Sequence, residues 1–136
     1  MTVAAALAEW LSKIESLSID TNHITDGSDK YGLFKAPNRD IKNYTDGSYE
    51  ITEYYDFFAR QDSISHSDRQ DSDEWLENLS YIADDAGTIY ELPELDGNRR
   101  VISIALTGAP YVMESGSNEV LYHMSMSVTY EREREV

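Results

Sequence analysis

The chain has 136 residues, no cysteine, and 26 acidic against 11 basic residues, which give a formal net charge of −15. This length suits one core, so we expect a single domain over residues 1–136. The lack of cysteine excludes disulfides, thiolate metal sites and cysteine nucleophiles. The negative charge argues against direct binding of duplex DNA, because phosphate neutralisation drives such binding. It favours solubility, a basic partner or a surface that keeps DNA from adhering.

The sequence contains no apolar run long enough to cross a bilayer as a helix. The first residues also lack the basic and apolar regions of a signal peptide. We therefore expect the protein to be made and kept in a cytoplasm.

Two segments have the apolar spacing of an amphipathic helix. The first follows Thr2, a suitable cap, and its apolar stripe contains Val3, Leu7, Trp10, Leu11, Ile14 and Leu17. The second precedes Gly87, a suitable C-terminal stop, and its stripe contains Trp75, Leu76, Leu79, Ile82, Ala83 and Ala86. The polar residues 61–72 predict a loop before the second helix, which would place Asp71, Asp73 and Glu74 near the helix N-terminus, where the dipole favours acids.

The middle of the chain predicts a β-hairpin. Residues 18–24 suit a short strand, residues 32–38 an extended segment and residues 39–44 the first hairpin arm. Asp46-Gly47 suits a two-residue type I′ turn, because both central positions of that turn need positive φ. Residues 49–60 then alternate with period two and predict the second arm.

The second arm carries aromatic residues on both faces. Tyr54 and Phe58 fall among charged residues, whereas Glu53 falls in the apolar set, which contains Tyr49, Ile51, Tyr55, Phe57 and Ala59. Such a strand is either central in a sheet covered on both faces or pressed against a second protein.

Most of the excess negative charge lies in residues 62–96. Eleven acids against one base, Arg69, give this segment a net charge of −10. The acids are Asp62, Asp68, Asp71, Asp73, Glu74, Glu77, Asp84, Asp85, Glu91, Glu94 and Asp96. This pattern is typical of a solvated helix face with flanking loops, or of a surface that faces DNA or a basic partner.

The last part of the chain predicts a second pair of strands. Residues 99–107 form one strand with a shared face, whose members are Ile102, Ile104 and Leu106. Gly108-Ala109-Pro110 interrupts this strand, and residues 111–113 resume it. Residues 120–130 alternate almost without a break, and the alternating charges of residues 131–135 continue that strand. We therefore predict an α+β fold, a largely antiparallel β-sheet with two amphipathic helices packed on it.

The sequence contains no recognisable catalytic, cofactor or metal motif. The three histidines, His23, His66 and His123, are not spaced as metal ligands, so each is interpreted as a surface or hydrogen-bonded residue. Asp71-x-Asp73 lacks the rest of a calcium loop, and Ser65-His66-Ser67 lacks a nucleophile elbow. Phosphate-binding glycine loops are absent too, although carboxylates paired in space stay possible among so many acids. We expect no enzymatic activity, no cofactor and no metal.

Several short segments of the sequence resemble those of a known family. They are Gly32-Leu-Phe-Lys-Ala-Pro-Asn38, Tyr44-Thr-Asp-Gly-Ser48, Glu53-Tyr-Tyr-Asp-Phe-Phe-Ala-Arg60 and the helix around Trp75-Leu-Glu-Asn-Leu79, followed by the closing strands that end near Tyr130. With them the chain resembles, over nearly its whole length, the small minor capsid proteins of bacteriophages with long non-contractile tails. These act as tail terminator or tail-to-head joining proteins.

The resemblance implies a ring, typically a hexamer, at the head-proximal end of the virion tail, assembled in the host cytoplasm. Its partners would be other copies of the chain, the tail tube protein and the head-tail connector, and DNA would pass through the lumen without specific binding. The implied subunit or tube contacts are Thr45, Asp46, Gly47, Ser48, Tyr49, Tyr54, Phe58, Arg132 and Arg134. The candidates for an acidic channel wall are Asp68, Asp71, Asp73, Glu74 and Glu77.

Two other functions stay open. A head-completion or connector protein of the same particle would leave tails of normal length without heads. An acidic inhibitor that mimics DNA would bind a basic enzyme rapidly and in a salt-sensitive way.

Overall fold

The computed structural model describes residues 2–15, 19–21, 30–62, 66–88, 90–115 and 119–133. These residues form two helices and five strands, which follow one another in the chain as α1 (Val3–Glu15), β1 (Ile19–Thr21), β2 (Lys30–Asn43), β3 (Tyr49–Asp62), α2 (His66–Asp84), β4 (Arg99–Ser115) and β5 (Glu119–Arg132). The predicted α+β class is confirmed.

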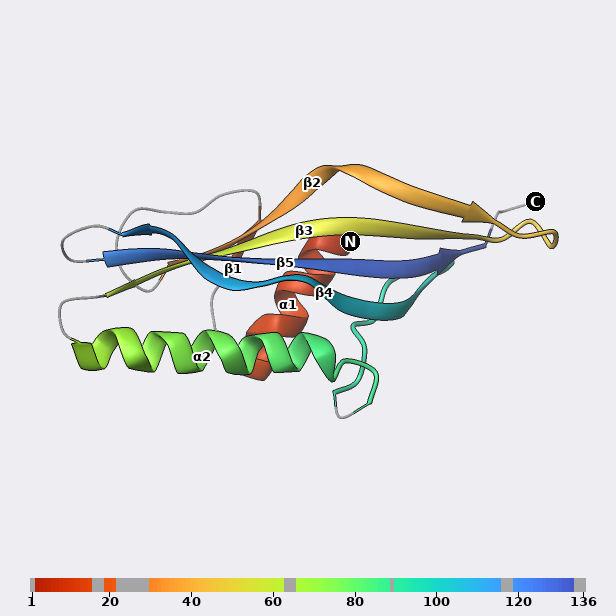
Figure 1. Cartoon of the computed structure of the whole chain (residues 1–136). Helices are drawn as coiled ribbons and strands as arrows, with labels where there is room; N and C mark the ends of the chain where they lie inside the picture. The colour runs from red at the N-terminus through yellow and green to blue at the C-terminus, as the bar shows by residue number, and fades with distance from the viewer. Residues whose placement is uncertain are drawn as a thin grey trace.

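The five strands form one sheet in the order β1-β2-β3-β5-β4. Only the short β1 pairs in parallel, with β2, and every other pair is antiparallel. Both helices lie against the same face of the sheet, α1 beneath β1 and β2 and α2 mainly beneath β4 (Figure 1). The molecule therefore has two layers, one of helix and one of sheet.

The core lies between these two layers. The period-two pattern of β5 is confirmed, because its alternate residues Val120, Tyr122, Met124, Met126, Val128 and Tyr130 are all buried. In α1, Leu7 and Leu11 face the same core, and in α2 Leu79 and Ile82 do. The apolar stripes read from the sequence thus become the contact between the helices and the sheet.

The hairpin between β2 and β3 is confirmed, but its predicted two-residue turn is wrong. Gly47 N–H donates to the Tyr44 carbonyl at 3.2 Å, and Tyr44 N–H donates to the Ser48 carbonyl at 2.9 Å. These bonds leave a three-residue turn in which Gly47 has φ of +93°. Asp46-Gly47 therefore marks the turn, with Gly47 in the left-handed position that follows a type I turn.

The predicted loop over residues 61–72 is wrong for the described residues of this range, and residues 63–65 lie outside them. β3 continues to Asp62, and α2 begins at His66. Asp71, Asp73 and Glu74 consequently lie inside α2 and not near its N-terminus. A polar sequence becomes helical here because the apolar stripe further along α2 anchors the whole helix on the sheet.

The predicted shared face of Ile102, Ile104 and Leu106 is wrong in one member. A register shift between Val101 and Ser103 turns Ile102 outward, so Val101 is buried in its place, and the predicted Ile104 is buried beside it. Further shifts follow around Gly108, where an interruption was predicted, and the strand continues to Ser115.

No helix in the described part of the chain has the length and apolar character needed to span a membrane.

Candidate interaction surfaces

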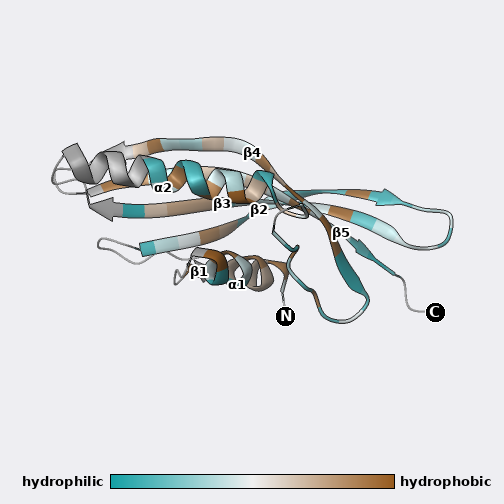
Figure 2. Cartoon of the chain, turned by 90° about the horizontal axis from the view of Figure 1, so that it is seen from below, coloured by the Kyte–Doolittle hydropathy of each residue, from teal (hydrophilic) through white to brown (hydrophobic). Residues whose placement is uncertain are grey.

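The sheet face opposite the helices is left uncovered by the described elements. No described element packs on it, and Figure 2, viewed from the helix side, places both helices in front of the same sheet. We name this surface the open face. It contains Tyr54 and Phe58, both half-buried, while their neighbours Tyr55 and Phe57 point into the core. Of the two explanations for aromatics on both faces of this strand, the doubly covered sheet is therefore wrong for the described residues.

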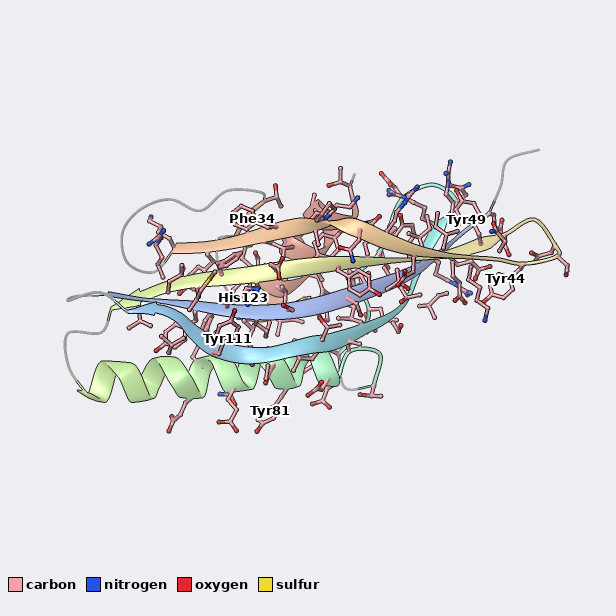
Figure 3. The ribbon with its side chains drawn as sticks, turned by 45° about the horizontal axis from the view of Figure 1, so that its top comes forward. Phe34, Tyr44, Tyr49, Tyr81, Tyr111 and His123 are labelled. Carbon is pink, nitrogen blue, oxygen red and sulfur yellow. The ribbon has the colours of Figure 1, made fainter. Side chains whose placement is uncertain are left out.

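An aromatic cluster occupies one half of the open face. Phe34 meets Phe58 edge to face, with ring centroids 5.3 Å apart. The ring of His123 lies 4.9 Å from that of Phe58 and 5.2 Å from that of Tyr111. These four side chains, from β2, β3, β5 and β4, thus form one row across the sheet. Figure 3 labels Phe34, His123 and Tyr111 of this row. The sequence does not reveal this row, because cross-strand register brings it together.

His123 is also bonded to polar neighbours on this face. Its Nε2 lies 2.7 Å from Asp56 Oδ1, and Ser125 Oγ donates to the same oxygen at 3.1 Å. Ser125 Oγ also lies 3.5 Å from His123 Nε2, so Asp56, His123 and Ser125 form one hydrogen-bonded group on the open face. The prediction of a hydrogen-bonded histidine holds for His123 at Nε2 alone, because Nδ1 is buried without a hydrogen-bond partner among the described residues. The side chains of His23 and His66 lie outside those described.

The other half of the open face carries polar side chains and ends in a row of charges. Thr52 and Thr129 exchange a hydroxyl hydrogen bond of 2.9 Å, and the Tyr54 hydroxyl donates to Asp40. The last row crosses four strands: Lys42, Glu50, Glu131 and Arg100. Arg100 and Glu131 form an ion pair of 3.0 Å in this row.

The predicted contact residues of the turn gather at the hairpin tip. Asp46 accepts hydrogen bonds from the hydroxyl and the N–H of Ser48, and these bonds hold the pKa of Asp46 below its ordinary value. Tyr49 directly follows the turn, and the Arg132 guanidinium lies 5.8 Å from its ring centroid while donating to its hydroxyl. Thr45 and Gly47 complete the tip.

Of the remaining predicted contact and channel residues, the structure describes some side chains and not others. Arg132 already binds Tyr49 within its own chain, and Arg134 lies outside the described residues. Asp68, Asp71 and Asp73 belong to α2, but their side chains lie outside those described. Glu74 and Glu77 are exposed on α2.

A groove runs between α2 and the outer strand β4. It has a volume of about 520 Å³ and is lined by Leu76, Glu77, Ser80, Tyr81, Ala109, Pro110, Tyr111, Val112 and Tyr122. The Tyr81 hydroxyl donates to Glu77, which raises the pKa of Tyr81 above its ordinary value. The sequence analysis missed this groove. The run Tyr111-Val112-Met113 was its available signal, because consecutive apolar residues in a strand point to both faces.

One carboxylate is buried beneath the hairpin. Glu53 accepts hydrogen bonds from the hydroxyls of Tyr55 at 2.6 Å and Tyr130 at 2.8 Å, and Lys35 Nζ lies 3.3 Å from it. Burial alone would raise the pKa of Glu53, but these three partners outweigh it and hold the pKa below its ordinary value. Burial, together with the hydrogen bond to Glu53 and the charge of Glu53, raises the pKa of Tyr130 to about 12.

Among the described residues, no three acidic or histidine side chains come close enough to hold a metal ion. Comparison with models of protein families finds no family that matches this chain. Comparison with curated protein sequences finds no significant match.

Proposed function

We propose that this chain is a structural subunit of a bacteriophage tail, a tail terminator that caps the finished tail tube and joins it to the head connector. The observation that carries the proposal is the open face. Both helices pack on one side of the sheet, which leaves the row of Phe34, Phe58, His123 and Tyr111 without a covering element in the described chain. An aromatic surface of this kind suits contact with another protein.

The hairpin tip is the second feature that supports an assembly role. Figure 1 shows the β2–β3 hairpin extending past the end of α2. The bonds within the turn and the contact of Arg132 with Tyr49 fix the shape of this arm. A projecting, fixed arm reaches a neighbouring subunit or the tail tube at low entropic cost.

The acidic side of α2 fits the same proposal. Glu74 and Glu77 are exposed there, and the chain as a whole carries a net charge of −15. We propose that this helix faces the channel through which DNA leaves the head, because a wall of carboxylates repels phosphates and prevents binding during passage. Other copies of the chain, the tube protein and the connector would be its partners.

The test is tail length in a phage that lacks this gene, measured by negative-stain electron microscopy. We expect tubes that run well beyond the normal length and carry no heads, because nothing stops tube polymerisation. Restoring the gene in trans should restore tails of normal length with heads.

Two other results would contradict the proposal. Tails of normal length that fail to join heads would assign the chain to the connector. Intact infectious particles would exclude both roles in the virion and favour an acidic inhibitor, which salt-sensitive binding to a basic enzyme would then reveal.

A further inference from the structure

Apart from Ile102, the large apolar side chains that are exposed among the described residues lie in two separate places. One lies at the hairpin end, where Ile41 is 48% and Tyr44 is 39% exposed. The other surrounds the groove between α2 and β4, where Tyr81, Tyr111, Val112 and Met113 are each at least 50% exposed. Figure 3 places Tyr44 at one end of the molecule, well away from Tyr81 and Tyr111.

The two patches cannot meet within one chain. Ile41 belongs to β2 and Val112 to β4, and the sheet order separates these strands by β3 and β5. Each patch therefore needs another molecule to cover it. Two different exposed apolar surfaces on one chain favour a head-to-tail contact, in which one surface of each copy binds the other surface of the next copy.

The hairpin patch lies on segment 41–44 at the end of β2, which we name the plug. Ile41 and Tyr44 lie at the end of a strand arm, and Lys42 Nζ lies 5.5 Å from the Tyr44 ring centroid. The hydrogen bond with Glu50 raises the pKa of Tyr44 above its ordinary value. The patch thus offers an aliphatic group, an aromatic ring and one cation on a fixed backbone.

The groove offers the complementary features. Val112, Pro110 and Leu76 supply apolar walls, and its volume of about 520 Å³ is ample for two side chains. Glu77 lines it, and Glu74 and Asp84 are exposed on the same helix. From residue 74 to residue 84, α2 contains no base. The cation of the plug would therefore face Glu77, which this contact assigns to the interface between copies, whereas Glu74 does not line the groove and stays available to the channel wall.

We propose that the segment 41–44 of one copy docks in the groove between α2 and β4 of a second copy. The contact is heterologous, so every copy donates one plug and accepts another, and the chain of contacts closes into a ring where the rotation between copies permits. This inference rests on the proposed function, which needs a repeating subunit, and it names the surfaces that the subunits use.

Cross-linking tests this contact directly, because the natural chain has no cysteine. Thr45→Cys places a thiol beside the plug. Met113→Cys places one beside the groove and leaves the residues that line the groove unchanged. The two variants, one with a size tag, are mixed at high protein concentration and treated with a short bismaleimide. We expect the mixed 45–113 product to dominate over the 45–45 and 113–113 products.

Ile102→Cys supplies the matched control, because Ile102 is also exposed on β4 but does not line the groove. The 45–113 product should exceed the 45–102 product several-fold. Equal yields, or a predominance of 45–45 or 113–113, would overturn the proposal. The first would mean random collision, and the second a symmetric contact between like patches.

A charge exchange tests the chemistry of the contact in the same assay. Lys42→Glu alone and Glu77→Lys alone should each lower the 45–113 yield several-fold through like-charge repulsion. Combining the two should restore it, because the pair is regenerated with its signs reversed. Failure of the combination to restore the yield would overturn the docking geometry.

These results are separable from those of the proposed function. If the contact forms but a phage without this gene makes normal tails, the docking is right and the tail function is wrong. If the contact is absent while that phage makes overlong tails, the tail function stands and the subunits use other surfaces.

Discussion

At the scale of single residues, Glu53 is the clearest case of a polar group whose surroundings determine its role. Its side chain is buried in the apolar set of β3, yet both carboxylate oxygens accept hydrogen bonds from tyrosines. The partners come from β3 and β5, and Lys35 adds a third contact from β2. The carboxylate therefore joins three strands in one register, and a shift of any strand would leave it buried without partners.

We expect Glu53→Gln to lower the free energy of unfolding by about 1–3 kcal/mol at neutral pH, because the amide cannot accept from both tyrosines or pair with Lys35. Because the pKa of Glu53 is lowered on folding, its stabilisation is present above the pKa of the unfolded chain and is lost as pH falls through the folded value. The difference between the two proteins should therefore shrink in acid. Urea unfolding from neutral to acidic pH measures it.

Glu50→Gln serves as the control, because Glu50 lies on the open face of the same strand. It should change the free energy of unfolding by less than about 0.5 kcal/mol. An equal loss in both variants, or a difference that grows in acid, would contradict the assigned role of Glu53.

At the scale of elements, the β2–β3 hairpin depends on the conformation of its turn. Gly47 has φ of +93°, and a Cβ added there would meet no atom within 4 Å. Gly47→Ala should therefore destabilise by backbone strain alone, about 1–2 kcal/mol. Gly47→Asn should lose less, because asparagine tolerates left-handed conformations better than alanine. Chemical unfolding of the two variants measures both losses.

Thr45→Ala in the same turn is the matched control, since Thr45 is exposed. It should change stability by less than about 0.5 kcal/mol. Losses of the same size for Gly47→Ala and Thr45→Ala would indicate that the turn conformation does not carry the effect.

Element positions followed largely from the sequence. Both helices were predicted from their apolar stripes, and β5 from its alternation, because a periodic pattern encodes the face that an element buries. The start of α2 was predicted too late, since the polar residues at its beginning carry no such pattern. The faces of β4 were partly wrong, because register shifts at Val101 and Gly108 change which side chains point inward.

At the scale of the whole molecule, the two faces of the sheet have different roles, and Phe57 and Phe58 compare them directly. Phe57 is fully buried in the core, whereas Phe58 is half-buried on the open face. Phe57→Ala should lower stability by about 3–5 kcal/mol through the cavity it leaves. Phe58→Ala should lower it by only about 1 kcal/mol, chiefly from its ring contacts with Phe34 and His123.

Two substitutions test the proposed assembly role of the open face. Phe58→Ala and Tyr54→Ala should each give folded protein by circular dichroism, yet fail to restore normal tails to a phage that lacks the gene. Loss of folding in Phe58→Ala comparable to that in Phe57→Ala would instead assign Phe58 to the stability of the monomer.

Part of the candidate site was predicted from the sequence, and the rest became apparent only in the structure. The turn residues 45–49 were predicted as a group because they are neighbours in the chain. Tyr54 and Phe58 were recognised from their place on the wrong face of β3. Phe34, Tyr111 and His123 were not linked to them, because only the register of four strands sets those rings side by side.

The sequence by itself determined the α+β class, the hairpin, both helices and the lack of a recognisable catalytic motif, because each depends on residues close together in the chain. Only the tertiary structure decided that both helices cover one face and that the groove lies between α2 and β4. It also decided which strand positions β4 turns outward. These features depend on contacts between segments that are distant in the chain. A local pattern of residues indicates which side chains are buried, but not which element covers them.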